Sequence, residues 1–246
     1  MKLFKLALAA LAVAATPAAA QVLKAPPATL DPAKAYALVE LRNVDGKKAA
    51  GTLVLARYDA EGGDVRGGTR SPGSALAKGV PVRVTIAGKP LVKSPGSRLY
   101  LVALEPDTWV IEGSGGTAFS LGSNRFAVAA GDIVDLGVVT PRTDWREGDG
   151  PEKITAGKVA KMALLGGFAM KKKAPTPMSI DLQPRGGADM PLPATLKAQA
   201  VPASYVPGAK FGNYLGGLVN RLDGRKGRPG ADAAPADEVE GTQPSS

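Results

Sequence analysis

Two pairs of closely spaced carboxylates are the residues of this chain whose types and spacing could support catalysis. Glu105 and Asp107 flank a proline, and Asp132 and Asp135 lie close together after a glycine. Paired carboxylates can act as general acid and base in glycoside hydrolysis when they face each other at a suitable separation. Both pairs also have the composition of ordinary turns. The sequence therefore favours a structural role for these four acids over a catalytic one.

Other catalytic and metal-binding patterns are absent from the sequence. The chain contains no histidine and no cysteine, which removes the usual ligands of zinc, copper and haem and the common nucleophile pairs. Ser74 and Lys78 do not have the Ser-x-x-Lys spacing, and residues 113–118 fit a dinucleotide pattern but precede a strand-like segment. No calcium-loop series of aspartates is present either. We therefore expect a non-enzymatic protein without a cofactor or a metal.

The elements that would position any site are short β-strands. Runs rich in Val, Ile, Leu and aromatic residues, separated by turns, are typical of half-buried antiparallel strands. Such runs cover residues 35–42, 52–58, 82–87, 99–104, 108–112, 118–121, 125–129 and 133–139. The turns between the last four are residues 113–116, 122–124 and 130–132. This pattern predicts a mainly β fold, an antiparallel β-sandwich of seven to eight strands, in which Trp109 is buried.

Two motifs in this region resemble a known family. Residues 104–109, Leu-Glu-Pro-Asp-Thr-Trp, are similar to a Leu-x-Pro-Gly-x-aromatic hairpin, with Asp107 in the place of the glycine. Residues 126–137 are similar to the closing pattern Phe-x-Val-x-x-Gly-x-x-x-x-Leu-Gly of transthyretin-like or carboxypeptidase-regulatory-like sandwiches. The resemblance covers residues 35–140. It implies a β-sandwich of the kind that recurs in bacterial envelope proteins of unknown function, and it transfers no catalytic residue.

The N-terminus has the parts of a secretory signal peptide. Lys2 and Lys5 precede an apolar run, and small residues lead up to Ala20. The apolar run is shorter than the roughly 20 residues that a spanning helix needs. We therefore predict a signal peptide over residues 1–20, with cleavage after Ala20 and a periplasmic or secreted mature protein. Because no cysteine follows the cleavage site, the lipid anchor of a lipoprotein is excluded.

The segments that flank the predicted sandwich are rich in proline. Residues 21–34 contain three prolines and predict an extended leader. Residues 141–223 predict a helix near 153–170, followed by a Pro-rich strap docked on the sandwich with a short helix near 214–222. Residues 224–246 are rich in Pro, Gly, Ala and charge and predict a disordered tail. The glycine-rich loop 59–79 is either a solvated hairpin tip or a ligand-binding loop.

Charge is unevenly distributed along the chain. Residues 21–150 contain 16 basic and 14 acidic residues, whereas residues 151–230 contain 13 and 4. The candidates for binding an anionic surface are Lys153, Lys158, Lys161, Lys171, Lys172, Lys173, Arg221, Arg225, Lys226 and Arg228. A basic arm of this kind is attracted to anionic membranes or acidic polymers, but charge runs also serve simply to keep a chain solvated.

These observations favour an exported β-sandwich module that binds or supports a component of the cell envelope. Its partner would be an anionic envelope polymer, a membrane surface or another protein, and nucleic acid is disfavoured outside the cytoplasm. One alternative is a peripheral membrane protein that acts through a basic apolar helix at 153–173. The other is a glycan hydrolase that uses the carboxylates named above.

Overall fold

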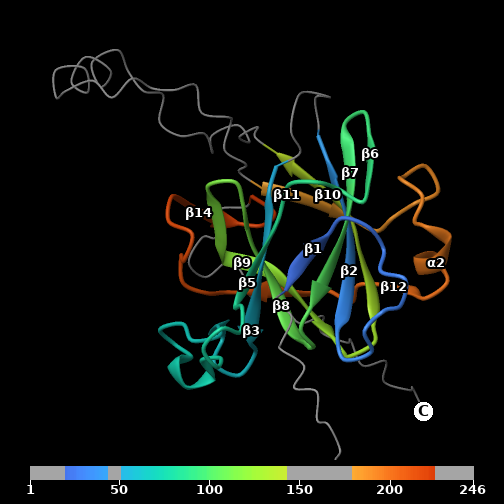
Figure 1. Cartoon of the computed structure of the whole chain (residues 1–246). Coiled ribbons are helices and arrows are strands. Elements are labelled where there is room, and N and C mark those ends of the chain that lie inside the picture. Colours follow the sequence, from blue (N-terminus) through green and yellow to red (C-terminus); the bar gives the residue numbers. More distant parts are fainter. Residues whose placement is uncertain (1–19, 44–50, 143–178, 225–246) are drawn as a thin grey trace, which may run out of the picture.

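The computed structural model describes residues 20–43, 51–142 and 179–224 of the chain. Residues 1–19 of the predicted signal peptide, the predicted helix at 153–170 and the predicted tail from residue 225 lie outside these ranges. The described residues form two sheets that pack face to face into a mainly β sandwich (Figure 1). The predicted fold class is therefore confirmed.

Sheet A has the strand order β1-β7-β2-β10-β11, with β6 paired to β7 and β12 paired to β10. Its strands are β1 (Gln21–Leu23), β2 (Ala35–Arg42), β6 (Val92–Ser94), β7 (Ser97–Leu104), β10 (Ile133–Arg142), β11 (Ser179–Gln183) and β12 (Ala200–Pro202). Strand β10 runs parallel to both β2 and β12, and the other pairs of this sheet are antiparallel.

Sheet B has the order β13-β9-β8-β3-β4, with β14 paired to β9 and β5 paired to β3. Its strands are β3 (Leu53–Asp59), β4 (Asp64–Val65), β5 (Arg83–Ile86), β8 (Asp107–Ser114), β9 (Thr117–Val128), β13 (Val206–Ala209) and β14 (Leu218–Arg221). Only β14 runs parallel to its neighbour among these pairs.

Alternating apolar residues of the two sheets form the core between them. On β2, Ala37, Val39 and Leu41 face this core, and the intervening Tyr36 and Leu38 belong to a second buried cluster. Strand β2 is therefore buried on both faces, where the sequence predicted one. Trp109 is fully buried, as predicted, and its indole N–H donates to the carbonyl of Glu105 at 2.9 Å. Burial of this large ring makes Trp109 a major contributor to the core.

Strand β9 differs from its prediction. The turn expected at residues 122–124 is absent, and one strand of 12 residues replaces two short ones. Partners on both sides hold the chain extended there: the Ser123 hydroxyl donates to the carbonyl of Ile111 at 2.6 Å, and Ser123 pairs with Ala209 of β13. Ladder pairing on both edges thus overrides the turn composition of Gly-Ser-Asn.

The strap, defined here as residues 179–224, supplies strands to both sheets. Strands β11 and β12 extend sheet A along β10, and β13 and β14 extend sheet B along β9. The two ends of the strap meet, because the Ile180 N–H donates to the carbonyl of Leu222 at 2.7 Å. The sandwich therefore extends past the predicted range 35–140 and has 14 strands among the described residues, where the sequence indicated seven or eight.

Two further elements differ from the sequence analysis. Residues 21–23 of the predicted leader form β1, which pairs with residues 101–103 of β7 and so covers the part of that edge that β6 leaves open. The short helix predicted near 214–222 is replaced by strand β14, since Gly216 and Gly217 adopt φ values of +66° and +86° that no α-helix contains.

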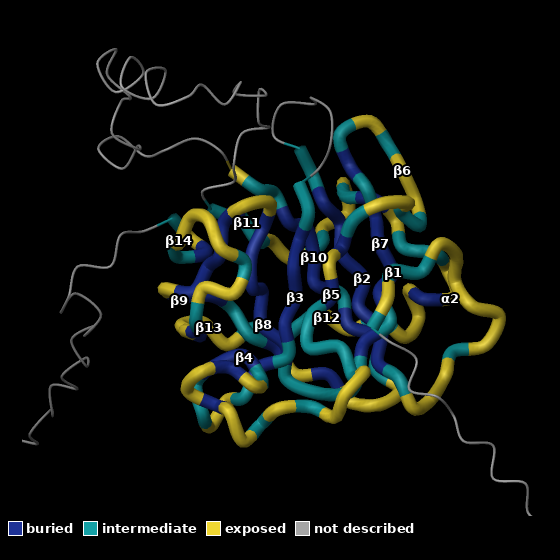
Figure 2. The backbone as a smooth tube through the Cα atoms, turned by 60° about the vertical axis from the view of Figure 1, so that its left-hand side comes forward, coloured by how far each residue is buried: buried dark blue, intermediate teal, exposed yellow. Residues whose placement is uncertain are grey.

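The strap also covers the outer faces of both sheets. Met190, and Leu196 of the turn-long helix α2 (Ala194–Lys197), pack on the outer face of sheet A. Ala209 and Phe211 pack with Tyr58 on the outer face of sheet B. Figure 2 shows the resulting distribution, with buried strands at the centre and mostly exposed turns around them. The strap therefore packs against the outer faces of both sheets.

Candidate functional site

Glu105 and Asp107, the first carboxylate pair nominated from the sequence, are both held by cations. Lys34 pairs with Glu105, and Arg57 and Arg66 contact Asp107 at 2.6 and 2.7 Å. Burial by itself raises the pKa of Asp107, but hydrogen bonds from Arg66 and Arg57 outweigh burial and hold this pKa below its usual value. A carboxylate kept ionised by two arginines is a poor proton donor. Its geometry suits the fastening of β3 to β8.

Asp132 and Asp135, the second nominated pair, hold two different parts of the structure. Asp132 accepts a hydrogen bond from the backbone N–H of Ala129 at 2.7 Å and so closes the turn before β10. Asp135 accepts hydrogen bonds from Arg185 at 2.8 and 3.1 Å and from the N–H of Gly137 at 2.9 Å. The first carboxylate therefore shapes a turn, and the second binds the strap.

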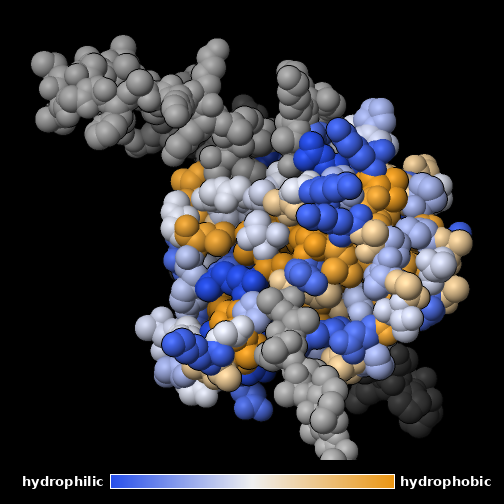
Figure 3. Space-filling model, viewed as in Figure 1, coloured by the Kyte–Doolittle hydropathy of each residue, from blue (hydrophilic) through white to orange (hydrophobic). Residues whose placement is uncertain are grey.

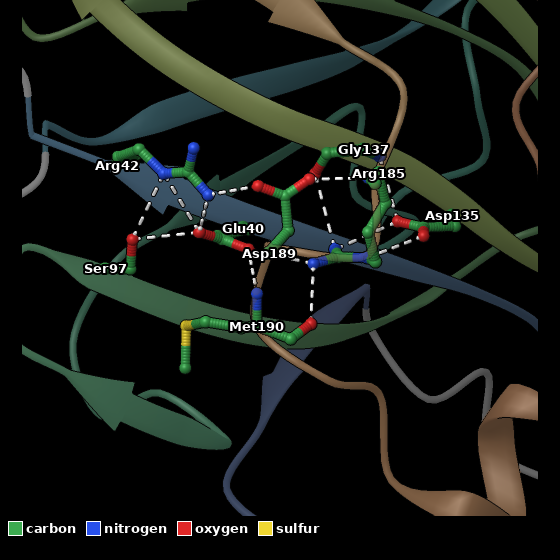
Figure 4. A network of polar contacts seen from close by, with 9 residues as sticks. Glu40, Arg42, Ser97, Asp135, Gly137, Arg185, Asp189 and Met190 are labelled. Carbon is green, nitrogen blue, oxygen red and sulfur yellow. Dashed lines mark hydrogen bonds and ion pairs between the residues drawn. The ribbon is translucent and has the colours of Figure 1, made fainter.

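Glu40 is the centre of a buried polar network beneath the strap (Figure 4). Its side chain is 0% exposed and accepts hydrogen bonds from Arg42 at 2.7 Å, Ser97 at 2.8 Å, Arg185 at 2.9 Å and the N–H of Met190 at 3.0 Å. Burial raises the pKa of Glu40, but the hydrogen bonds from Arg42, Ser97 and Met190 outweigh it, so this pKa lies below its usual value. Glu40 is thus an ionised hub.

Arg185 joins this hub to Asp135. Its Nη1 donates to Glu40 and to the carbonyl of Met190 at 3.1 Å, while Nε and Nη2 donate to Asp135. Asp189 completes the network by binding Arg42. Two strap residues are therefore locked onto strands β2 and β10 by charge-assisted hydrogen bonds, which are the stronger kind. This network could not be predicted from the sequence, because its members lie as far apart as residues 40 and 189.

Asp64 plays the same part on sheet B. This fully buried carboxylate accepts hydrogen bonds from the Tyr214 hydroxyl at 2.8 Å and from the N–H groups of Gly212 and Arg70, each at 3.1 Å. Although burial raises the pKa of Asp64, these hydrogen bonds hold it below the usual value. The loop 59–79 is therefore pinned to the strap at Asp64, and it is not simply a solvated tip.

Glu112 is the exception among the buried acids. Its carboxylate is 0% exposed and contacts Arg83 at 2.7 Å. Burial raises the pKa of Glu112 above its usual value, and the hydrogen bond from Arg83 offsets that effect only in part. The Arg83 guanidinium carbon also lies 5.0 Å from the centroid of the Tyr214 ring, a cation–π distance. This chain of contacts again ends on the strap.

A pocket of about 210 Å³ lies where the strap crosses from sheet A to sheet B. Asn124, Gln183, Arg185 and Tyr205 are among the residues that line it. The Arg185 guanidinium is already bound to Asp135 and Glu40, and the Tyr205 hydroxyl donates to the carbonyl of Leu136 at 2.9 Å. The Arg185 guanidinium and the Tyr205 hydroxyl are therefore already engaged in hydrogen bonds within the fold.

Of the basic residues nominated for binding an anionic surface, Arg221 lies in the described part of the chain. It belongs to β14, and its Nε is 3.6 Å from a carboxylate oxygen of Asp223. The other nine, Lys153, Lys158, Lys161, Lys171, Lys172, Lys173, Arg225, Lys226 and Arg228, lie outside the described residues. Arg221 thus contributes to an ion pair at the edge of sheet B.

The strand registers gather a different set of cations at one end of the sandwich. Arg42 at the end of β2 pairs with Ser97 at the start of β7, and β10 runs parallel to β2, so Arg142 lies at the same end. In sheet B, Leu53 pairs with Ile86, which places the following Lys89 at this end too. Lys93 and Arg98 lie beside the β6–β7 turn. We call this set the basic end: Arg42, Lys89, Lys93, Arg98 and Arg142.

Three cations of the basic end differ from the arginines inside the fold. Within residues 20–43, 51–142 and 179–224, Lys89, Lys93 and Arg98 have no ion pair, whereas Arg42 and Arg142 are paired with carboxylates. Figure 3 shows strongly hydrophilic side chains gathered at the upper end of the molecule, where β6 and β7 meet. The described surface thus offers positive charge at this end.

The opposite end of the sandwich carries the acids. Asp31 precedes β2, Asp132 precedes β10, and Asp59 and Glu61 follow from the end of β3. Glu105 and Asp107, in the connection between β7 and β8, complete the acidic end, which we define as these six residues. Lys34, Arg57 and Arg66 contact Glu105 or Asp107 at this end, and the cations Arg70 and Lys78 lie in the loop 59–79 that follows β3. The two ends therefore differ in how their charges are paired, a difference that the near-zero sum of charge over residues 21–150 does not reveal.

Comparison with protein-family models, with curated proteins and with solved structures finds no match to this chain. In the described ranges, no group of three or more acidic side chains is arranged so as to hold a metal ion. No helix among those residues has both the length and the apolar character needed to cross a bilayer.

Proposed function

We propose that the protein is an exported, non-enzymatic β-sandwich module that binds an anionic component of the cell envelope through its basic end. Export to the periplasm or the medium rests on the predicted signal peptide. The likeness of residues 35–140 to transthyretin-like sandwiches of envelope proteins supports the same assignment. The observation that carries the proposal is the group of cations at the basic end, Lys89, Lys93 and Arg98, that have no ion pair among the described residues.

The way in which the acids are used supports this reading. Glu40, Asp107 and Asp135 each bind at least one arginine, and Glu112 forms an ion pair with Arg83. These carboxylates contribute to the fold and are withdrawn from the surface field. Lysines at the basic end are left to set that field, which attracts anions over about one Debye length, roughly 8 Å at physiological salt.

The attachment points of the basic segment support the proposal further. Residues 143–178 contain 7 Lys plus Arg and 4 Asp plus Glu. This segment leaves the sheet at Arg142 and returns at Ser179, and these two residues pair with each other at the basic end. The positive charge predicted from the sequence is thus attached where the described cations gather.

Co-sedimentation tests the proposal. The mature chain from Gln21 is mixed with anionic vesicles, with neutral vesicles and with isolated envelope, across a salt series. We expect binding to anionic vesicles and envelope that weakens as salt rises and drops when Lys171, Lys172 and Lys173 are changed to Gln. Binding that ignores salt, or turnover of envelope glycans that requires Asp107 or Asp135, would contradict the proposal.

A further inference from the structure

The β6–β7 hairpin places two cations directly opposite each other. Lys93 of β6 pairs in register with Arg98 of β7, so both side chains leave the same face of the hairpin. Directly opposed residues of an antiparallel pair have Cβ atoms about 5 Å apart, and like charges in that position are destabilising. Lys93 is exposed and Arg98 half-buried, and in the described part of the chain no carboxylate pairs with either. The hairpin thus maintains a repulsion that an anion would relieve.

The hairpin is held rigid beneath these cations. Pro95 and Gly96 form its turn, and Gly96 has φ of +76°, as the third position of a type II turn requires. The Gly96 carbonyl accepts a hydrogen bond from the N–H of Asn43 at 2.8 Å, and the Leu91 N–H donates to the carbonyl of Leu99 at 2.8 Å. Binding would therefore require little ordering of the backbone, which favours affinity.

From this geometry we propose that Lys93 and Arg98, assisted by Lys89, form a binding site for a phosphomonoester group. This inference rests on the proposed function and names the anion that the basic end recognises. Two cations facing one position match a group that carries nearly two negative charges. A phosphomonoester carries about −1.5 to −2 at neutral pH, whereas a carboxylate or a phosphodiester carries one. The guanidinium fork of Arg98 matches two phosphate oxygens, and Lys93 adds a point charge.

The surroundings of the site give it a defined pH response. Among the described residues, the hairpin carries Lys93 and Arg98, the adjacent strand β2 carries Arg42 and Glu40, and Asp189 and Arg185 of the strap are bound to those two. The pKa of Glu40 lies below its usual value, because the hydrogen bonds that it accepts outweigh its burial. The chain has no histidine. Any loss of binding between about pH 7.5 and about pH 5 therefore reports the phosphate, whose second pKa is about 6.

Vesicle binding tests the site in the full mature chain. Phosphatidic acid supplies a phosphomonoester and phosphatidylglycerol a phosphodiester, each in phosphatidylcholine vesicles matched for surface charge. We expect tighter binding to phosphatidic acid, and we expect this preference to vanish as the pH falls through about 6. The double variant Lys93→Gln, Arg98→Gln should lose the preference and roughly 25-fold in affinity, taking about five-fold for each cation.

Matched variants separate the possible failures. Lys78→Gln with Lys197→Gln removes the same charge from exposed positions away from the hairpin and should leave the preference intact. The charge-preserving pair Lys93→Arg, Arg98→Lys should retain most of the affinity, and circular dichroism confirms that each variant keeps its sheets. If the hairpin variant bound both lipids like the wild type, the site would be wrong while the proposed function stood. If the wild type bound no anionic vesicle, the proposed function itself would fail.

Soluble competitors identify the source of the phosphate. Displacement of the protein from phosphatidic acid vesicles by phenyl phosphate, and not by benzoate, would assign recognition to a single phosphomonoester. A preference for phosphatidic acid that resists phenyl phosphate would assign it to phosphates presented together on a lipid surface. Equal displacement by benzoate and phenyl phosphate would overturn the assignment to phosphate.

Discussion

The two ends of the sandwich use charge in opposite ways. At the acidic end, Arg57 and Arg66 converge on Asp107, whose side chain is 8% exposed, so that opposite charges are paired in a largely dry site. At the basic end, Lys93 and Arg98 face each other without an acid among the described residues. The first arrangement stabilises the fold. The second costs some stability and leaves a field that acts on other molecules.

The contrast explains why net charge alone is a poor guide to the surface of this protein. The arginines Arg42, Arg83 and Arg185 bind buried carboxylates through several hydrogen bonds each. Arginine suits that use because its fork donates in fixed directions, whereas lysine is a flexible and strongly hydrated point charge. Arg42, Arg83 and Arg185 therefore hold the strap, whereas Lys89 and Lys93 have no ion pair among the described residues.

Asp107→Asn should produce the largest effect on stability. The change leaves Arg57 and Arg66 without a counter-charge in a part-buried site, which typically costs about 3 to 5 kcal/mol in the free energy of unfolding. The matched change at the basic end is Asp181→Asn, whose partner Arg142 is 49% exposed, and it should cost at most about 1 kcal/mol. Chemical denaturation measures both. Equal losses would remove the distinction between the two ends.

The loss of stability at acid pH is a second test of the pairing of Asp107 with Arg57 and Arg66. Because the pKa of Asp107 is lowered in the folded state, its contribution is complete above the unfolded value of 3.8 and is lost as the pH falls through the folded pKa. The wild type should therefore lose more stability than Asp107→Asn over this acid range. If the two proteins showed parallel stability curves below that pH, Asp107 would not be the ionised partner of the two arginines.

Lys93→Gln should produce a small effect of the opposite sign. Removing one of two like charges that face each other across β6 and β7 should raise the free energy of unfolding by about 0.2 to 1 kcal/mol. Measurement at low salt, where screening is weakest, gives the clearest difference. A loss of stability would mean that Lys93 has a stabilising partner in the folded state. The repulsion between Lys93 and Arg98, on which the proposed anion site rests, would then be absent.

Much of the sandwich could be predicted because its central strands have strong local signals. The alternation in residues 35–42 and 82–87 predicted strands that match β2 (Ala35–Arg42) and β5 (Arg83–Ile86), and the burial of Trp109 follows from its place between turns. The strap strands escaped prediction because they have three to five residues and contain or adjoin Pro and Gly. Such segments become strands only because β9 and β10 offer them an edge.

The candidate site could not be predicted from the sequence, because its cations come together only through the pairing of the strands. The 16 basic and 14 acidic residues of the segment 21–150 look balanced when they are summed. Only the registers of β2 with β7 and of β3 with β5 show that Lys89, Lys93 and Arg98 lie at one end. The roles of Glu40 and Asp64 depend likewise on partners about 150 residues away in the strap.

The most direct test of the central claim is a measurement of which end faces the bound surface. The chain has no cysteine, so Val92→Cys at the exposed edge of β6 and Ala60→Cys at the acidic end each provide one reactive thiol. The rate of labelling by a water-soluble maleimide is compared with and without phosphatidic acid vesicles. We predict that binding slows labelling at position 92 several-fold and leaves position 60 unchanged. Protection of position 60, or equal protection of both, would contradict binding through the basic end.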